Sequence, residues 1–365
     1  MKIPAVLLVL FCGIISEVFA FELTWAGMFN GSVLSRQSTS AELQMRYFPK
    51  LSLVEKVNTN TTIDLYLEPQ LKTRLFFNKQ WLGVKENTIL DEYRGWLRYS
   101  RPQWELRAGL QKINFGPARL LRSQQWFDQI DPRDPLSLSK GVYALLFRYY
   151  QLNNWNYWVW SVWQKDSGFY PLLKQQKNKM EWGGRVEGPW LHGMWGLTAD
   201  SKPVVIEKIP VQLHRMALDA YYDWHLGYWV EVVAHQWDTG TNWYQSRWTL
   251  GMDYTLPFQN GIYLSLEMMG YSRAENSLNF KNENIYYALQ ANWPFNLFNS
   301  LSIMSFLDWK TGEAYYTITL THRRQNVELH ILGLYSSRKA QLPEFTSGEI
   351  GLGGKALMML FVFYH

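Results

Sequence analysis

Hydrophobic and polar residues alternate along most of this chain. In residues 103–112, one face carries an apolar series and the other a polar series: Trp104, Leu106, Ala108 and Leu110 against Glu105, Arg107, Gly109 and Gln111. The same alternation recurs in residues 212–224, 247–254, 261–269, 283–293 and 326–335. A period of two is that of a β-strand whose two faces meet different environments. The pattern therefore predicts an all-β protein.

The alternating segments define the strands that we expect. There are about 18 of them, within a range of about 16 to 18, because strand boundaries read from one sequence are loose. Pro49 and Pro69 make the second and third strands the weakest, since proline belongs at edges and bulges. The expected strands are residues 21–34, 41–56, 62–76, 88–100, 103–112, 141–150, 155–164, 180–188, 192–200, 212–224, 228–238, 245–256, 261–273, 283–294, 299–309, 313–323, 326–338 and 354–364.

The lengths of the connections indicate how these strands are arranged. Every second connection is short: 57–61, 101–102, 151–154, 189–191, 225–227, 257–260, 294–296 and 324–325. The interleaved connections are mostly longer and more polar: 35–40, 77–87, 113–140, 165–179, 201–211, 274–282 and 339–353. Short turns at one rim and long loops at the other are typical of an antiparallel up-and-down transmembrane barrel. In lipid such a sheet must close, because its edge groups would find no water partner.

Composition and the first residues support a membrane barrel. Hydrophobic residues make up 47% of the chain and aromatic residues 16%, with 19 Trp and 22 Tyr. Residues 1–20 combine Lys2, an apolar run and a small-x-small end at Ala20, which is typical of a Sec signal peptide. We therefore expect one barrel domain, residues 21–365, in the outer membrane of a Gram-negative cell. The alternative is a soluble, secreted all-β protein such as a carbohydrate-binding sandwich.

If the apolar faces contact lipid, the polar faces line the lumen. Acidic side chains expected there are Asp64, Glu68, Glu92 and Glu105. The candidate solute-contacting residues are Lys72, Arg74, Arg94, Arg98, Arg107, Gln111 and Arg148. An excess of lumen cations favours anionic or strongly dipolar solutes. The alternative is that these charges pair across strands and only stiffen the wall.

The longest connection, residues 113–140, contains both charges and apolar anchors. Its candidate constriction residues are Arg119, Arg122, Asp128, Asp131, Arg133 and Asp134, and its apolar residues include Leu120, Leu121, Trp126, Phe127 and Ile130. So many apolar side chains would not remain in water, so we expect the segment to fold into the barrel and narrow it. The alternative is an ordered extracellular cap.

A short stretch around this connection resembles a known family. It comprises Arg107-Ala-Gly109-Leu-Gln111, Gly116, Arg119-Leu120, Gln125-Trp126 and Gly141-Val142. Over residues 107–150 it is similar to the alginate-export family of outer-membrane porins. The resemblance implies a monomeric 18-stranded barrel with an arginine-rich, anion-selective lumen. It gives Arg107 and Arg119 solute-contacting roles and Gln111 a polar role in the wall. The run from Asp131 to Pro135 departs from that family, so alginate itself is not carried over.

Other chemistry is not indicated. The seven His are scattered, and His322 and His330 have no cysteine or carboxylate cluster beside them, so neither a metal site nor a cofactor is expected. No Ser–His–carboxylate set and no dense basic stretch is evident, so we expect neither an enzyme nor a nucleic-acid-binding protein. The terminal strand, ending Phe363-Tyr364-His365, resembles the signal read by the barrel-assembly machinery.

Together these features predict a channel for passive diffusion of small anionic or sugar-like solutes across the outer membrane. One alternative is a plugged barrel whose extracellular loops bind a partner or a surface polymer. A third function is that of a barrel hydrolase, since spatial triads can be invisible in sequence.

Overall fold

The chain forms one antiparallel sheet. The computed structural model describes residues 22–36, 40–78, 87–128, 130–133, 138–139, 141–163, 174–176, 179–206, 209–238, 242–275, 278, 280–281, 284–337 and 354–365. The expected signal peptide, residues 1–20, lies outside them. None of the described residues forms a helix long and apolar enough to cross a membrane.

The sheet has 18 long strands and the two-residue strand β8. The first half comprises β1 (Glu22–Arg36), β2 (Ser40–Asn58), β3 (Thr61–Asn78), β4 (Asn87–Arg101), β5 (Trp104–Gln111), β6 (Val142–Tyr150), β7 (Asn156–Val162), β8 (Lys174–Gln175), β9 (Glu181–Trp190) and β10 (Gly193–Ile206). The second half comprises β11 (Ile209–Asp223), β12 (Gly227–Asp238), β13 (Asn242–Leu256), β14 (Ile262–Glu275), β15 (Asn284–Pro294), β16 (Asn299–Asp308), β17 (Glu313–Arg324), β18 (Val327–Ser336) and β19 (Gly354–Tyr364).

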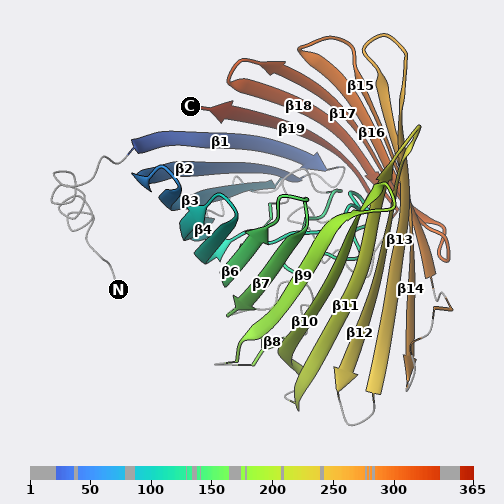
Figure 1. The fold of residues 1–365 in the computed structure, drawn as a ribbon. Coiled ribbons are helices and arrows are strands. Elements are labelled where there is room, and N and C mark those ends of the chain that lie inside the picture. The colour runs from blue at the N-terminus through green and yellow to red at the C-terminus, as the bar shows by residue number, and fades with distance from the viewer. Residues whose placement is uncertain are drawn as a thin grey trace.

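The sheet closes into a barrel. Strands adjacent in sequence pair with each other, except that β7 pairs directly with β9. The first strand, β1, pairs with β2 on one side and with β19 on the other, so blue β1 lies beside red β19 in Figure 1. The prediction of an up-and-down antiparallel barrel is confirmed, and each expected segment corresponds to one long strand.

The two alternating series of residues lie on the inner and the outer face of the barrel. On β11, Arg215 and Asp219 are buried and point inward, whereas Met216 and Leu218 keep 58% and 45% of their surface exposed on the outer face. Successive strand residues point to opposite faces, so the apolar series covers the outside of the barrel. The polar series lines the lumen.

One connection was predicted wrongly. Residues 201–211 were expected to form a long loop, but β10 extends to Ile206 and β11 begins at Ile209, and these two residues pair. The β-branched run Val204-Val205-Ile206 favours extended backbone. In addition, Val204 is fully buried in a small cluster with Val211 and Leu213. Likewise, β1 extends to Arg36 and β2 begins at Ser40, so both strands reach into the expected connection 35–40.

The two prolines interrupt backbone pairing without ending the strands. Between β2 and β3, pairing breaks off after Tyr47 with Leu71 and resumes at Leu51 with Leu67, so Pro49 and Pro69 lie in the gap. Proline has no backbone N–H to donate to a ladder. The strands predicted there are therefore correct.

A bulge beside Pro69 changes the faces of β4. Glu68 pairs with Arg94 but Pro69 pairs with Glu92, which leaves Tyr93 as an extra residue. The extra residue moves Glu92 to the outer face, where its carboxylate accepts a hydrogen bond from the Tyr143 hydroxyl. The expectation that Glu92 enters the lumen is therefore wrong, while Arg94 beyond the bulge still points inward.

Candidate functional site

The connection between β5 and β6 is called the inward segment below, and its described residues, 113–128, 130–133, 138 and 139, cross the interior of the barrel (Figure 1). Near its start, Phe115 stacks on Trp160 of β7 with ring centroids 5.8 Å apart, and Phe127 meets the same ring edge-on at 5.7 Å. Farther along, Leu120 and Leu121 join a buried cluster from the inner faces of β14–β19 and β1. The expectation that this segment folds into the lumen, and not over it as a cap, is confirmed.

Two buried carboxylates of the opposite wall hold the inward segment. Glu267 of β14 accepts backbone N–H bonds from Arg119 at 2.7 Å, Leu120 at 2.9 Å and Leu121 at 2.5 Å. Glu231 of β12 accepts two more, from the backbone N–H groups of Ala118 and Gln124, at 2.9 and 3.0 Å. Both glutamates have 0% exposure. Five backbone N–H groups of the segment thus donate to two buried side chains of the wall, which fix the segment across the lumen.

The close approach to Glu231 depends on a glycine. Gly116 has φ +87°, a left-handed conformation that favours glycine, and a Cβ there would overlap the Glu231 carboxylate. Sequence reasoning did not identify Glu231 or Glu267. The only signal was an isolated acid at an inward position of an otherwise apolar or aromatic strand.

Most charges of the inward segment pair within it. Arg122 binds Asp128 through two bonds of 2.8 and 3.2 Å, and the Arg133 side chain binds Asp131 at 2.9 and 2.8 Å. These candidate constriction residues therefore shape the segment itself. Asp134, the remaining acid of the set, lies outside the described residues.

Arg119 differs from the other arginines of the inward segment. It reaches the barrel wall, where its guanidinium binds Asp253 of β13 at 2.6 Å and contacts the Tyr263 hydroxyl. The same group lies over the Trp229 ring, 4.9 Å from its centroid. With 44% of its side chain exposed, Arg119 still faces the lumen.

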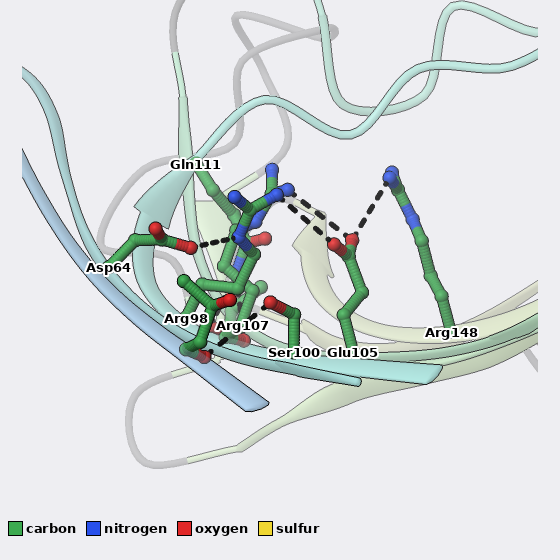
Figure 2. Close-up of polar contacts among 9 residues, drawn as sticks. Asp64, Arg98, Ser100, Glu105, Arg107, Gln111 and Arg148 are labelled. Atoms are coloured by element: carbon green, nitrogen blue, oxygen red, sulfur yellow. Dashed lines mark hydrogen bonds and ion pairs between the residues drawn. The ribbon is translucent and has the colours of Figure 1, made fainter. Parts of the chain in front are cut away.

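Three arginines on the inner faces of β4–β6 converge on one glutamate, and we call Arg98, Arg107 and Arg148 the arginine wall (Figure 2). Their guanidinium groups contact the Glu105 carboxylate at 3.4, 3.3 and 3.4 Å. Arg98 also binds Asp64 of β3 at 2.6 Å. Three cations thus share two carboxylates, which leaves the cluster with a net positive charge. The Arg98 side chain is 32% exposed, so this charge faces open space.

Aromatic rings hold the arginine wall in place. The guanidinium of Arg107 lies 4.6 Å from the centroid of Trp96, and that of Arg148 lies 3.9 Å from the centroid of Trp158. Trp96 in turn stacks on Tyr66 of β3 with centroids 5.1 Å apart. Cation–π contacts orient the planar groups without neutralising their charge.

The other candidate lumen residues have different surroundings. Arg94 donates to the carbonyl oxygens of Tyr93 and of Ser139, at the end of the inward segment. Lys72 and Arg74 lie on the inner face, opposite Arg46 and Gln44 of β2.

Gln111 is also on the inner face but has 0% exposure. Its amide donates to the backbone carbonyls of Ala144 and Arg107 at 2.8 and 3.2 Å. A structural role in the wall fits these contacts, whereas contact with a solute does not.

The inner faces of β9–β14, called the anchor wall below, contain ion pairs that the sequence analysis did not single out. Arg185 binds Asp219 at 2.6 and 2.9 Å, and Arg215 binds Asp200 at 2.6 Å and also contacts Glu181. All of these side chains are buried. Among the described residues, no group of three or more His, Cys, Asp or Glu could hold a metal ion.

Closure, strand number and a long inward segment together define the fold of an outer-membrane porin, and comparisons with solved structures agree. The chain is similar to OccD3 (OpdP) of Pseudomonas aeruginosa, with a TM-score of 0.58, 12% identity, and coverage of 94% of this chain and 91% of that one. It is similar to OccAB1 of Acinetobacter baumannii, with a TM-score of 0.57, 10% identity, and coverage of 94% and 96%.

A third similar structure is an anion-selective porin from Comamonas acidovorans, with a TM-score of 0.50, 10% identity, and coverage of 95% and 100%. At such identities the likeness shows the fold alone. No protein-family model matches the chain, and no curated protein is significantly similar to it. The resemblance of residues 107–150 to alginate-export porins therefore stays a prediction.

Proposed function

We propose that this protein is an outer-membrane channel through which small anionic or sugar-like solutes diffuse passively. The observation that carries the proposal is the arginine wall, where Arg98, Arg107 and Arg148 share two carboxylates on the lumen side of a closed barrel. A net positive field at a constriction raises the local concentration of anions and repels cations. Among the structural neighbours, the Comamonas acidovorans protein is described as an anion-selective porin, in line with this proposal.

The same wall offers a path for polar, uncharged solutes. Guanidinium groups donate several hydrogen bonds in a fixed plane, whereas the Glu105 carboxylate between them accepts hydrogen bonds. Sugar hydroxyls both donate and accept, so they can exchange bonds with these groups as they pass. Small organic anions would in addition be attracted by the net charge.

Ion selectivity in planar bilayers tests the proposal. With a KCl gradient across the membrane, the reversal potential of the wild-type channel should show a preference for Cl⁻ over K⁺. The triple variant Arg98→Gln, Arg107→Gln and Arg148→Gln should lose that preference while keeping the barrel. Lys310→Gln removes a charge from an exposed turn and is the control. The proposal fails if the protein forms no discrete conductance steps, or if the triple variant stays anion-selective.

A second candidate function is a plugged barrel whose extracellular loops bind a partner or a surface polymer. It is favoured by the firm attachment of the inward segment, which Glu231 and Glu267 hold across the lumen through five backbone hydrogen bonds. Deletion of residues 127–135 separates the two. A wild type that conducts, and conducts more after the deletion, supports a channel narrowed by this segment. A wild type that does not conduct supports the plugged barrel.

The cellular setting belongs to the same proposal. An apolar outer face around a closed barrel fits the lipid of an outer membrane. Export by the Sec pathway through residues 1–20, and recognition of the terminal strand β19 by the barrel-assembly machinery, would deliver the chain there. A shift in gel mobility between unboiled and boiled samples of the outer-membrane fraction would test this location, since intact barrels migrate differently.

A further inference from the structure

The short turns of the barrel differ in composition from one side of its rim to the other. Each of five adjacent turns contains Leu, Phe or Trp, and we call them the apolar arc: β6–β7, β9–β10, β11–β12, β13–β14 and β15–β16. The other three, the polar arc, contain none of these residues: Gln325-Asn326, Thr59-Asn60 and Pro102-Gln103. Both arcs are continuous along the rim, because β19 and β1 join β18 to β2.

The apolar arc presents a large apolar side chain at every turn. The exposed fraction of these side chains runs from 51% for Phe258 to 93% for Leu297, and the full row is Leu152, Leu191, Trp224, Phe258 and Leu297. A single exposed apolar residue is ordinary on a protein surface. A row of them on adjacent turns marks a surface that contacts something other than water.

The apolar arc continues the outer face of the barrel. Tyr222 and Tyr228 flank the turn of Trp224, pair with each other and are exposed on the outer face. On β13, Tyr254 and Leu256 lead in the same way to the turn of Phe258. Trp and Tyr near strand ends form the usual interfacial belt of a membrane barrel. Here the apolar surface extends beyond that belt into the turns themselves.

The turn between β15 and β16 bonds much of its own backbone. The Asn296 side-chain oxygen accepts backbone N–H bonds from Phe298 and Asn299, both at 2.9 Å. From the neighbouring turn, the Asn260 amide donates to the Phe295 carbonyl at 2.7 Å. Backbone groups can leave water only when they find such partners. This turn therefore meets the main requirement for contact with lipid.

The polar arc has the opposite character. Two of its three turns directly follow an exposed arginine, Arg101 at the end of β4 and Arg324 at the end of β17. Beside the latter, the Arg323 side chain is 63% exposed. By contrast, the turns of the apolar arc contain no Asp, Glu, Lys or Arg between their strands. Charged groups are the ones that cost most to remove from water, so the two arcs suit different surroundings.

We propose that the apolar arc is embedded in the phospholipid headgroup region at the short-turn rim, whereas the polar arc stands in water. In barrels of this kind the short turns lie on the periplasmic side, so the lipid is that of the periplasmic leaflet. Phospholipid fits better than a protein partner, because the arc continues the lipid-facing surface and lacks the polar rim of a protein interface. The inference goes beyond solute passage and rests only on the outer-membrane location.

Spin labels at the turn tips test the depth of the two arcs. The only cysteine, Cys12, lies in the expected signal peptide, so single cysteines can be placed in the mature chain without competition. Leu152→Cys and Leu297→Cys report on the apolar arc, and Thr59→Cys and Asn326→Cys on the polar arc. The labelled barrels are reconstituted into vesicles of phosphatidylethanolamine and phosphatidylglycerol. Unboiled gel mobility verifies that each variant is folded.

Collisions with oxygen, which concentrates in lipid, are then compared with collisions with a water-soluble nickel chelate. The ratio of oxygen to nickel collisions should be severalfold higher at Leu152 and Leu297 than at Thr59 and Asn326. Met216→Cys, on the outer face of β11, gives the reference for a label in lipid. Equal nickel collisions at all four turns overturn the proposal. Labels at Leu152 and Leu297 that nickel reaches in vesicles but not in isolated outer membranes also overturn it, and indicate a protein partner.

A second measurement does not depend on labels. Leu152→Asp together with Leu297→Asp should lower the fraction of protein that folds into preformed vesicles, because two charges would have to enter the headgroup region. Thr59→Asp together with Asn326→Asp adds the same charge to the polar arc and should fold like the wild type. Equal folding yields for the two double variants contradict the proposal. Anion-selective conductance with all four turns in water would leave the proposed function standing and refute the embedded arc alone.

Discussion

The arginine wall and the anchor wall contain the same types of charged residue, but these residues lie in different surroundings. On the anchor wall, the Arg185 and Arg215 side chains are 4% and 5% exposed, and each has a buried aspartate as partner. On the arginine wall, Arg98 is 32% exposed and shares the Glu105 carboxylate with two other arginines. The alternation in sequence is equally clear on both sides. Exposure and charge balance, not residue type, separate structural ions from ions that can act on a solute.

The inward segment causes the difference. It packs Phe115 and Trp126 against Arg185 and Arg215 of the anchor wall. Water is excluded there, and these two arginines and their aspartates lie in a dry environment, where ions persist only when paired. The inward segment lies away from Arg98, which stays accessible and unbalanced. A single connection therefore divides the lumen into a sealed half and an open half.

Removing one partner of a sealed ion pair should have the largest effect. Arg215→Ala leaves the carboxylates of Asp200 and Glu181 buried without their guanidinium. We expect a loss of about 3–5 kcal/mol in the free energy of unfolding, the usual result of breaking a buried pair from one side. Guanidinium unfolding of the barrel in lipid vesicles measures it. Arg148→Ala on the open side should cost less, because Glu105 keeps Arg98 and Arg107 as partners. Equal losses for the two variants would contradict the division into a sealed and an open half.

Releasing the inward segment should have the next largest effect. Glu267→Ala leaves the backbone N–H groups of Arg119, Leu120 and Leu121 without their acceptor, at a cost of about 1–3 kcal/mol for each one that stays buried. The segment should then move out of its position, and single-channel recordings should show a larger and noisier conductance. Glu267→Gln keeps one carbonyl acceptor and should give an intermediate result. An unchanged, quiet conductance in Glu267→Ala would show that the apolar contacts of Leu120 and Leu121 suffice.

The strands and their faces could be predicted from sequence because alternation is a local property. Each stretch such as residues 103–112 reports its own inside and outside without reference to the rest of the chain. The prediction failed at Glu92, where the bulge beside Pro69 adds one residue and reverses the faces. It also failed at residues 201–211, where burial of Val204 in a tertiary cluster decided between loop and strand.

Contacts across the lumen could not be predicted in the same way. The apolar residues of the inward segment indicated that it enters the barrel, but nothing local indicates where it attaches. Glu231 and Glu267 receive it only because closure and register bring β12 and β14 opposite β5. For the same reason the sequence could not show that Gln111 has a structural role while Arg98 faces the lumen. Gln111 is buried and donates to backbone carbonyls, whereas Arg98 is more exposed.

A smaller effect should follow from changing the charge balance of the open side. Glu105→Gln removes the carboxylate that all three arginines share, without removing an arginine. One unit charge acting over about 10 Å of water is worth about 0.4 kcal/mol to an ion and has opposite sign for Cl⁻ and K⁺, so the preference for Cl⁻ over K⁺ should rise roughly fourfold. Reversal potentials in planar bilayers measure the ratio. The matched change on the sealed side, Asp219→Asn, should leave the ratio unaltered if it folds. A fall in anion preference after Glu105→Gln would mean that Glu105 is needed to hold the arginines in the lumen.

A change of salt concentration should distinguish the open half of the lumen from the sealed half without any mutation. We expect this effect to be the smallest. Raising KCl from 0.1 M to 1 M shortens the Debye length from about 10 Å to about 3 Å. The field of Arg98, Arg107 and Arg148 acts through solvent, so the wild-type anion preference should decline toward unity over this range. The bonds from Glu231 and Glu267 to the inward segment are buried and should not be screened, so open-channel noise should stay constant. The opposite result would be open-channel noise that grows with salt and an anion preference that persists. Solvent would then have to reach Glu231 and Glu267 and not the arginine wall, and the roles assigned to the two halves of the lumen would have to be exchanged.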